Sequence, residues 1–86
     1  MKIDIKDFKF GSGPATVKVG TKVTWTNLDA VPHTATADNT SFDSGTLQKG
    51  QSFSFTFTQP GEIKYYCALH GGPNGQGMAS TITIKP

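Results

Sequence analysis

The chain has 86 residues, eight lysines, no arginine and six acidic residues, so its formal net charge at pH 7 is only +2. The absence of a basic run argues against nucleic-acid binding, and no apolar run approaches the roughly 20 residues of a membrane helix. The length predicts one domain spanning residues 1–86. A single cysteine excludes a disulfide within the chain.

Apolar residues alternate with charged ones at the start of the chain. Ile3 and Ile5, followed by Phe8 and Phe10, predict a first strand, and the change of phase between the two pairs predicts a bulge near Lys6-Asp7. The Gly-Ser-Gly-Pro run that follows predicts a turn. Charged side chains in this stretch are expected on the solvent face.

The middle of the chain predicts further short strands with turns between them. Strands are expected at Val17–Val19, Val23–Thr26 and His33–Ala37 because β-branched and aromatic residues alternate there with polar ones. Residues 38–50 are the least regular part, and either a loop or one helical turn is expected in them.

The second half contains the clearest alternation. Phe53, Phe55 and Phe57 alternate with hydroxyl residues, so the three rings are expected to point inward. After a Pro-Gly turn, one face of the next strand is expected to carry Ile63, Tyr65 and Cys67, and a last strand is expected to start at Met78. Short strands separated by turns every eight to twelve residues predict an all-β sandwich.

One set of side chains predicts a metal site. Cys67 is the only cysteine, His70 follows it by three residues, and His33 is the only other histidine. A thiolate and two imidazoles with a weak axial thioether are the ligands of blue-copper sites, and Met78 offers that thioether. We therefore predict one copper ion per chain, bound by His33, Cys67, His70 and Met78.

Several stretches resemble the small cupredoxins of the plastocyanin/azurin type. They are the segment from Val23 to Thr34, which carries the first histidine, the Phe-Asp-Ser-Gly run at 42–45, the aromatic segment 53–61, and Tyr65–His70 with Gly77-Met78. The resemblance extends from about Val17 to the end. It implies a Greek-key sandwich of about seven to eight strands with the four predicted ligands at one pole.

The chain departs from this family pattern in two places. The family usually has its methionine only a few residues after the second histidine, whereas seven residues, four of them glycine, separate His70 from Met78 here. That slack is expected to weaken the axial bond, and it leaves Gln76 or solvent as alternative axial ligands. The family commonly has Asn after the first histidine to link the two ligand loops. Thr34 replaces it, although its backbone N–H remains available to donate to the Cys67 sulfur.

The resemblance implies an electron carrier, not an enzyme, that cycles between Cu(II) and Cu(I). Transient redox partners are expected to dock near His70, and the protein is expected to be monomeric. The implied location is extracytoplasmic (periplasmic, lumenal or cell-surface), with any export signal absent from this chain. A copper transport or storage module is the alternative, and a copper oxidoreductase with an open axial position is a further one.

Overall fold

A computed structural model describes residues 1–86 and contains eight strands and no helix. The strands are β1 (Lys2–Lys6), β2 (Lys9–Phe10), β3 (Ala15–Lys18), β4 (Lys22–Asn27), β5 (Thr36–Ala37), β6 (Ser52–Thr56), β7 (Gly61–Gly72) and β8 (Gln76–Lys85). No helix is long and apolar enough to cross a membrane.

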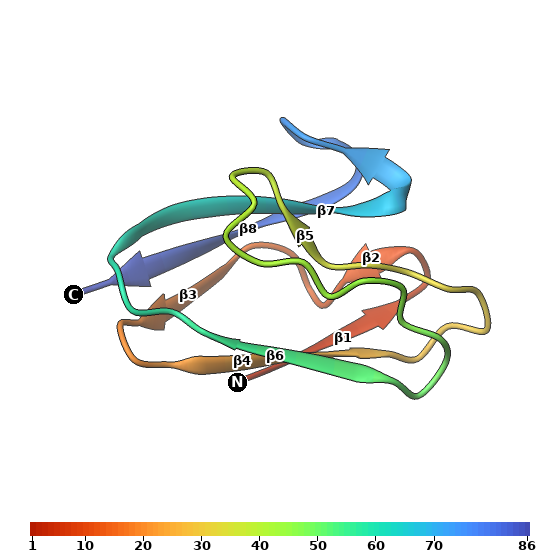
Figure 1. Cartoon of the computed structure of the whole chain (residues 1–86), viewed down its shortest axis with the longest axis horizontal. Helices are drawn as coiled ribbons and strands as arrows, with labels where there is room; N and C mark the ends of the chain where they lie inside the picture. The colour runs from red at the N-terminus through yellow and green to blue at the C-terminus, as the bar shows by residue number, and fades with distance from the viewer.

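The strands form two four-stranded sheets that pack as a sandwich, as the alternation predicted (Figure 1). One sheet has the order β2-β1-β4-β6 and the other the order β3-β8-β7-β5. The pairs β1/β4 and β3/β8 are parallel, whereas all the other pairs are antiparallel. Both sheets are therefore mixed, and strands far apart in the sequence lie side by side in each.

Aromatic rings fill the space between the sheets. Trp25 of β4 is fully buried, and its ring lies 5.0 Å from Phe42 and 5.5 Å from Tyr65. Phe57 is buried as predicted, but Phe53 and Phe55 are only partly buried and pack against the edge of the core. Replacing a buried aromatic such as Trp25 with alanine typically costs about 3–5 kcal/mol, so this cluster supplies much of the folding free energy without a metal.

The predicted bulge near Lys6-Asp7 is wrong. Ile5 pairs with Phe10 and Lys6 pairs with Lys9, so β1 and β2 form a tight hairpin. Its two turn residues, Asp7 and Phe8, have φ values of 54° and 60°. Positive φ at both central residues is the requirement of a type I′ turn. Phe8 consequently lies at the tip of the hairpin, and 49% of it is exposed.

The region after the first histidine is less regular than predicted. Only Thr36 and Ala37 of the expected strand form β5, whereas His33 makes an isolated antiparallel bridge with Leu47. The segment 38–50 contains turns and isolated bridges but no helical turn. Because Leu47 and His33 exchange both backbone hydrogen bonds, at 2.7 and 3.1 Å, this long loop holds the histidine in place.

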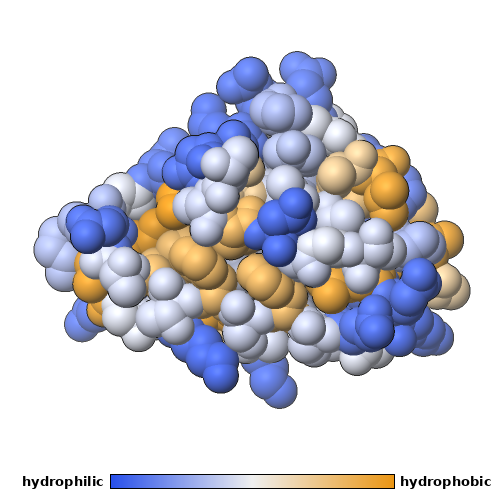
Figure 2. Space-filling model, viewed as in Figure 1, coloured by the Kyte–Doolittle hydropathy of each residue, from blue (hydrophilic) through white to orange (hydrophobic).

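One end of the sandwich gathers the β1–β2 turn, the 28–32 loop and the end of β7, on the right in Figure 1. Several large apolar side chains of these three segments are exposed, namely Phe8, Leu28, Val31 and Leu69. Figure 2 shows apolar surface between polar residues on the same side of the molecule.

Candidate metal centre

The three strongest predicted ligands come from two separate parts of the fold. Cys67 and His70 both belong to β7, whose pairing with β8 shifts register between Tyr66 and Gly71. His33 comes from the loop before β5 and is held by its bridge to Leu47. Cys67 and His33 are completely buried, whereas His70 is exposed.

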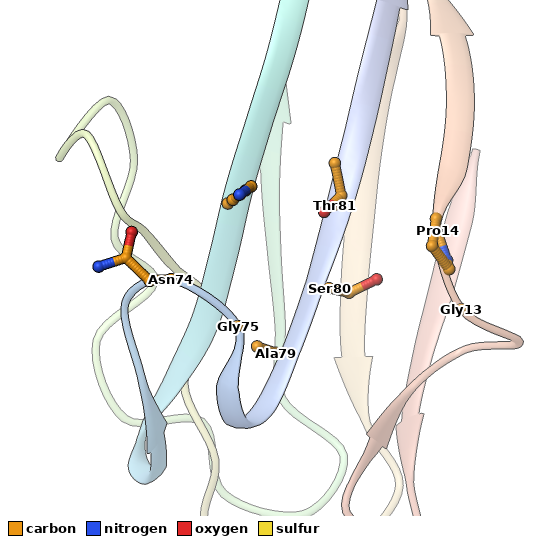
Figure 3. Close-up of a pocket in the computed structure, with 8 residues that line it drawn as sticks. Gly13, Pro14, Asn74, Gly75, Ala79, Ser80 and Thr81 are labelled. Carbon is orange, nitrogen blue, oxygen red and sulfur yellow. The ribbon is translucent and has the colours of Figure 1, made fainter.

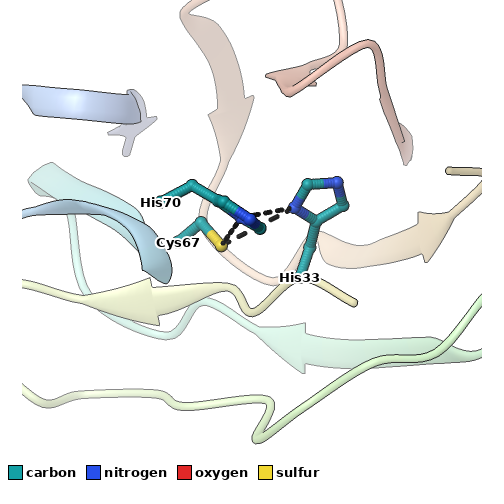
Figure 4. Close-up of side chains that lie close together, drawn as sticks. All are labelled: His33, Cys67 and His70. Atoms are coloured by element: carbon teal, nitrogen blue, oxygen red, sulfur yellow. Dashed lines mark hydrogen bonds between the residues drawn. The ribbon is translucent and has the colours of Figure 1, made fainter. Parts of the chain in front are cut away.

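The donor atoms of these residues converge (Figure 4). The Cys67 sulfur lies 3.7 Å from Nδ1 of His33 and 3.4 Å from Nδ1 of His70, and the two nitrogens lie 3.2 Å apart. A point equidistant from all three atoms lies about 2.0 Å from each, which is the length of a metal–imidazole bond. The arrangement therefore fits one small ion bound by a thiolate and two imidazoles.

Thr34 links the two ligand segments through its backbone and its side chain. Its N–H donates to the Cys67 sulfur at 3.4 Å, which confirms that part of the expectation. Its hydroxyl accepts a hydrogen bond from the N–H of Ala68 at 2.8 Å. A hydrogen bond to the sulfur is one of the interactions that adjust the redox potential of such a site. Threonine thus makes the link that the family resemblance assigned to asparagine.

Two residues that the sequence did not predict to be part of the site lie beside the histidines. Oδ2 of Asp29 is 2.7 Å from Nε2 of His33, the ring nitrogen that faces away from Cys67. The Phe8 ring packs edge-on against both imidazoles, with centroids 5.1 Å from His33 and 4.7 Å from His70. Asp29 precedes His33 by four residues within one loop, where sequence spacing does not by itself bring two side chains together, so no sequence signal would have found it.

Asp29 is held in its ionised form. Partial burial acts to raise the pKa of its carboxyl group, but the N–H groups of Asp7 and Phe8, and then His33, lower it, and the net direction is downward. The carboxylate accepts hydrogen bonds from those two N–H groups at 2.8 and 3.1 Å. A negative charge therefore lies next to the buried histidine.

The segment between His70 and Met78 is not slack. Gly71 pairs with Gly77 and Gly72 with Gln76, so β7 and β8 continue beyond His70 as a hairpin of residues 71–77, here called the ligand hairpin. A Cβ on Gly77 would lie 2.6 Å from the carbonyl oxygen of His70, so glycine is required for this close approach.

The axial position stays a prediction. Met78 is buried in β8, and a Cβ on Gly71 would lie 2.7 Å from its backbone nitrogen, so Met78 lies across the hairpin from the His70 segment. Gln76 is exposed.

Two grooves lie along β8, and neither contains the converging donors. Figure 3 shows the groove between the β2–β3 turn, β8 and the tip of the ligand hairpin, with a volume of about 370 Å³. Its lining has one charged residue, Lys64, and no acid, histidine or cysteine. The second groove, of about 500 Å³, lies beside the β1–β2 hairpin and is also without those residue types. Neither groove presents a paired acid and base.

A strand sandwich that brings one buried thiolate and two imidazoles together at its end has the architecture of the small blue-copper proteins. The family model described as copper binding proteins, plastocyanin/azurin family, matches residues 1–85. The chain belongs to this family of copper-binding proteins, as the sequence resemblance indicated.

Individual relatives agree with this assignment. Amicyanin from Paracoccus denitrificans is 36% identical over 78 residues, which cover 79% of this chain and 56% of that protein. A chloroplastic plastocyanin from Tetradesmus obliquus is 32% identical over 87 residues, covering 88% of this chain and 58% of its own length. The chain thus spans a little over half the length of these relatives.

Solved structures show the same fold. An oxidised amicyanin mutant superposes with a TM-score of 0.84 at 27% identity, covering 99% of this chain and 81% of the other. A Cu(I) form of another amicyanin mutant also has a TM-score of 0.84, at 28% identity over the same shares.

Proposed function

We propose that this protein is a one-electron carrier with a mononuclear type 1 copper site bound by His33, Cys67 and His70. The observation that carries the proposal is the convergence of one sulfur and two Nδ1 atoms within 3.2–3.7 Å of one another. When bound, copper supplies the one-electron step between Cu(II) and Cu(I). Thiolate and imidazole ligands serve both oxidation states, so the folded chain keeps its geometry during the change.

The buried and the exposed residues of the site are proposed to have different roles. Cys67 and His33 are buried, so water is kept from the thiolate. His70 is exposed and is the edge through which we propose that electrons pass to and from partners. The exposed Phe8, Val31 and Leu69 supply an apolar surface of the kind that transient redox complexes use.

Met78 is proposed as the axial ligand, since it is the buried thioether on the strand paired with the Cys67 strand. Replacing Met78 with leucine is then expected to raise the reduction potential while the visible band persists, because the thiolate bond carries the colour. Gln76→Leu is the matched control from the same hairpin. If only the Gln76 variant changes the potential, Gln76 is the axial ligand. If neither does and azide perturbs the spectrum, solvent occupies that position.

A Cu(II) titration of the metal-free protein tests the central proposal. We expect one copper per chain and an intense thiolate-to-copper band in the visible region, which Cys67→Ala abolishes. A colourless wild-type complex, or equal colour in Cys67→Ala, contradicts a blue-copper site.

The speed of electron exchange separates the proposed carrier from a copper transport or storage module with the same ligands. A carrier is expected to show fast electron self-exchange between its Cu(II) and Cu(I) forms, measured by NMR line broadening in mixtures of the two. Slow exchange together with ready transfer of copper to a chelator favours the transport or storage function. We propose a carrier and not an enzyme, because the three converging donor atoms account for a one-electron step at a bound copper.

We also propose that residues 1–86 form one cupredoxin domain that acts as a monomer at an extracytoplasmic location. A lone cysteine fits a reducing cytosol, and it also fits this location when a metal occupies the Cys67 thiolate and protects it from forming disulfides. Sedimentation of the copper form tests the monomeric state, and fractionation of the source cells tests the location.

A further inference from the structure

The carboxylate of Asp29 accepts three hydrogen bonds from two separate parts of the site. Oδ1 accepts from the N–H of Asp7 at 2.8 Å, and Oδ2 accepts from the N–H of Phe8 at 3.1 Å. Oδ2 also lies 2.7 Å from Nε2 of His33, the shortest of the three contacts. The side chain is 13% exposed and His33 is fully buried, so little water competes for this contact.

The contact with His33 determines which ring nitrogen carries the proton. An ionised carboxylate can only accept hydrogen bonds, so Nε2 of His33 must carry the hydrogen. In the neutral ring Nδ1 then has the free lone pair, and Nδ1 is the nitrogen that faces the Cys67 sulfur. The imidazole is therefore ready for a metal before any metal arrives.

The other two hydrogen bonds hold the tip of the β1–β2 hairpin. Asp7 and Phe8 both have positive φ, a conformation that non-glycine residues rarely adopt without support. Their N–H groups point to one carboxylate, which stabilises the turn and keeps the Phe8 ring edge-on to both imidazoles. A loop-capping role alone accounts for the backbone contacts but not for the 2.7 Å contact with a ring nitrogen.

We propose that Asp29 is a positioning residue for the copper site. It fixes the tautomer and orientation of His33, makes that imidazole a stronger electron donor, and holds Phe8 against both histidine rings. Carboxylates that accept from a metal-bound histidine raise the basicity of the ligand. Greater basicity favours Cu(II) over Cu(I), so Asp29 lowers the reduction potential. This inference rests on the proposed copper site.

The first experiment needs no metal. Long-range ¹H–¹⁵N spectra of the metal-free protein at about pH 8, where an ordinary imidazole is neutral, report the tautomer of His33. We expect the Nε2–H form in the wild type and a mixture of tautomers in Asp29→Ala. Asp29→Asn keeps one oxygen, which can still accept from His33, so it is expected to retain the Nε2–H form.

The second experiment measures the copper form. Asp29→Ala is expected to lower the affinity for Cu(II) by about 10- to 100-fold. If Cu(I) affinity is unchanged, each tenfold loss raises the potential by about 59 mV. Asp29→Asn is expected to lie between the wild type and Asp29→Ala. The control is Glu62→Gln, which removes the same charge at the start of β7, eight residues before His70.

The outcomes distinguish this inference from the proposed function. An Nε2–H tautomer that persists in Asp29→Ala, or a potential equal to that of Glu62→Gln in both Asp29 variants, overturns the positioning role. If Asp29→Ala does not fold, the potential of Asp29→Asn against Glu62→Gln decides. A wild type that binds no copper contradicts the proposed function instead, and the tautomer comparison still decides whether Asp29 fixes His33.

Discussion

His33 and His70 offer the same ring nitrogen to the site from contrasting surroundings. His33 is fully buried, its backbone is bonded to Leu47, and its outer ring nitrogen contacts Asp29. His70 is exposed and precedes a glycine-rich hairpin. We call the surroundings of His33 the enclosed side of the site and those of His70 the open side. The comparison indicates that the enclosed side sets the geometry of the site and that the open side gives access to it. Four predictions test that contrast.

Replacing each histidine in turn should give the largest difference. His33→Ala removes a buried ring and leaves the Asp29 carboxylate without its partner, so the free energy of unfolding of the metal-free protein should fall by about 2–4 kcal/mol. His70→Ala removes an exposed ring, and the loss should stay within about 0.5 kcal/mol. Urea denaturation of both variants measures the two values. Equal losses would mean that the two sides are equally important to the fold.

A methyl group on Gly77 should destabilise the hairpin that follows His70, on the open side of the site. Its Cβ would lie 2.6 Å from the backbone oxygen of His70, and its φ is +62°. Gly77→Ala should cost about 2 kcal/mol or more, because a backbone clash adds to the cost of a left-handed alanine. Gly75→Ala is the matched control, since its φ is +77° with nothing within 4 Å, and only about 1 kcal/mol is expected. Thermal melts measure both, and equal losses would indicate a hairpin that adjusts freely.

Most of the strands and the Cys67–His70 ligand pair could be predicted from the sequence, because both depend on local patterns. The alternation from Ile63 to Cys67 and the spacing of Cys67 and His70 are each confined to a few residues. Asp29 could not be found in this way, because its partners at positions 7, 8 and 33 meet only in the folded chain. The expected slack after His70 is wrong for another reason. The number of glycines indicates a flexible segment, but Asn74-Gly75 among them is a strong turn signal that favours a hairpin.

High pH should lower the free energy of unfolding through Tyr65, which is buried two residues before Cys67. Burial raises the pKa of this phenol, so the unfolded chain loses its proton first, near pH 10. Its contribution to stability is complete below that pH and is lost above it, as pH rises toward the folded-state pKa. The slope is at most about 1.4 kcal/mol per pH unit. Tyr65→Phe should remove this slope in urea titrations between about pH 9 and 11. An unchanged slope would assign the loss to other groups.

The smallest effect is expected at the tip of the ligand hairpin. Oδ2 of Asp38, next to β5, accepts a hydrogen bond from the N–H of Asn74 at 2.8 Å. Asp38→Ala should cost only about 0.5–1 kcal/mol, because the contact is exposed. Hydrogen exchange at the Asn74 amide should become faster, while exchange at the Thr34 amide, on the enclosed side, should not change. Faster exchange at both would show that the two sides open together.

The parallel pairing of β3 with β8 has a kinetic consequence. It joins Ala15 to Ile82, so one sheet is complete only when residues from nearly opposite ends of the chain have met. Contacts of such long sequence separation slow folding, and sandwiches of this kind typically fold in milliseconds to seconds. Trp25, the only tryptophan, is fully buried between the sheets, so its fluorescence reports this closure after dilution from urea.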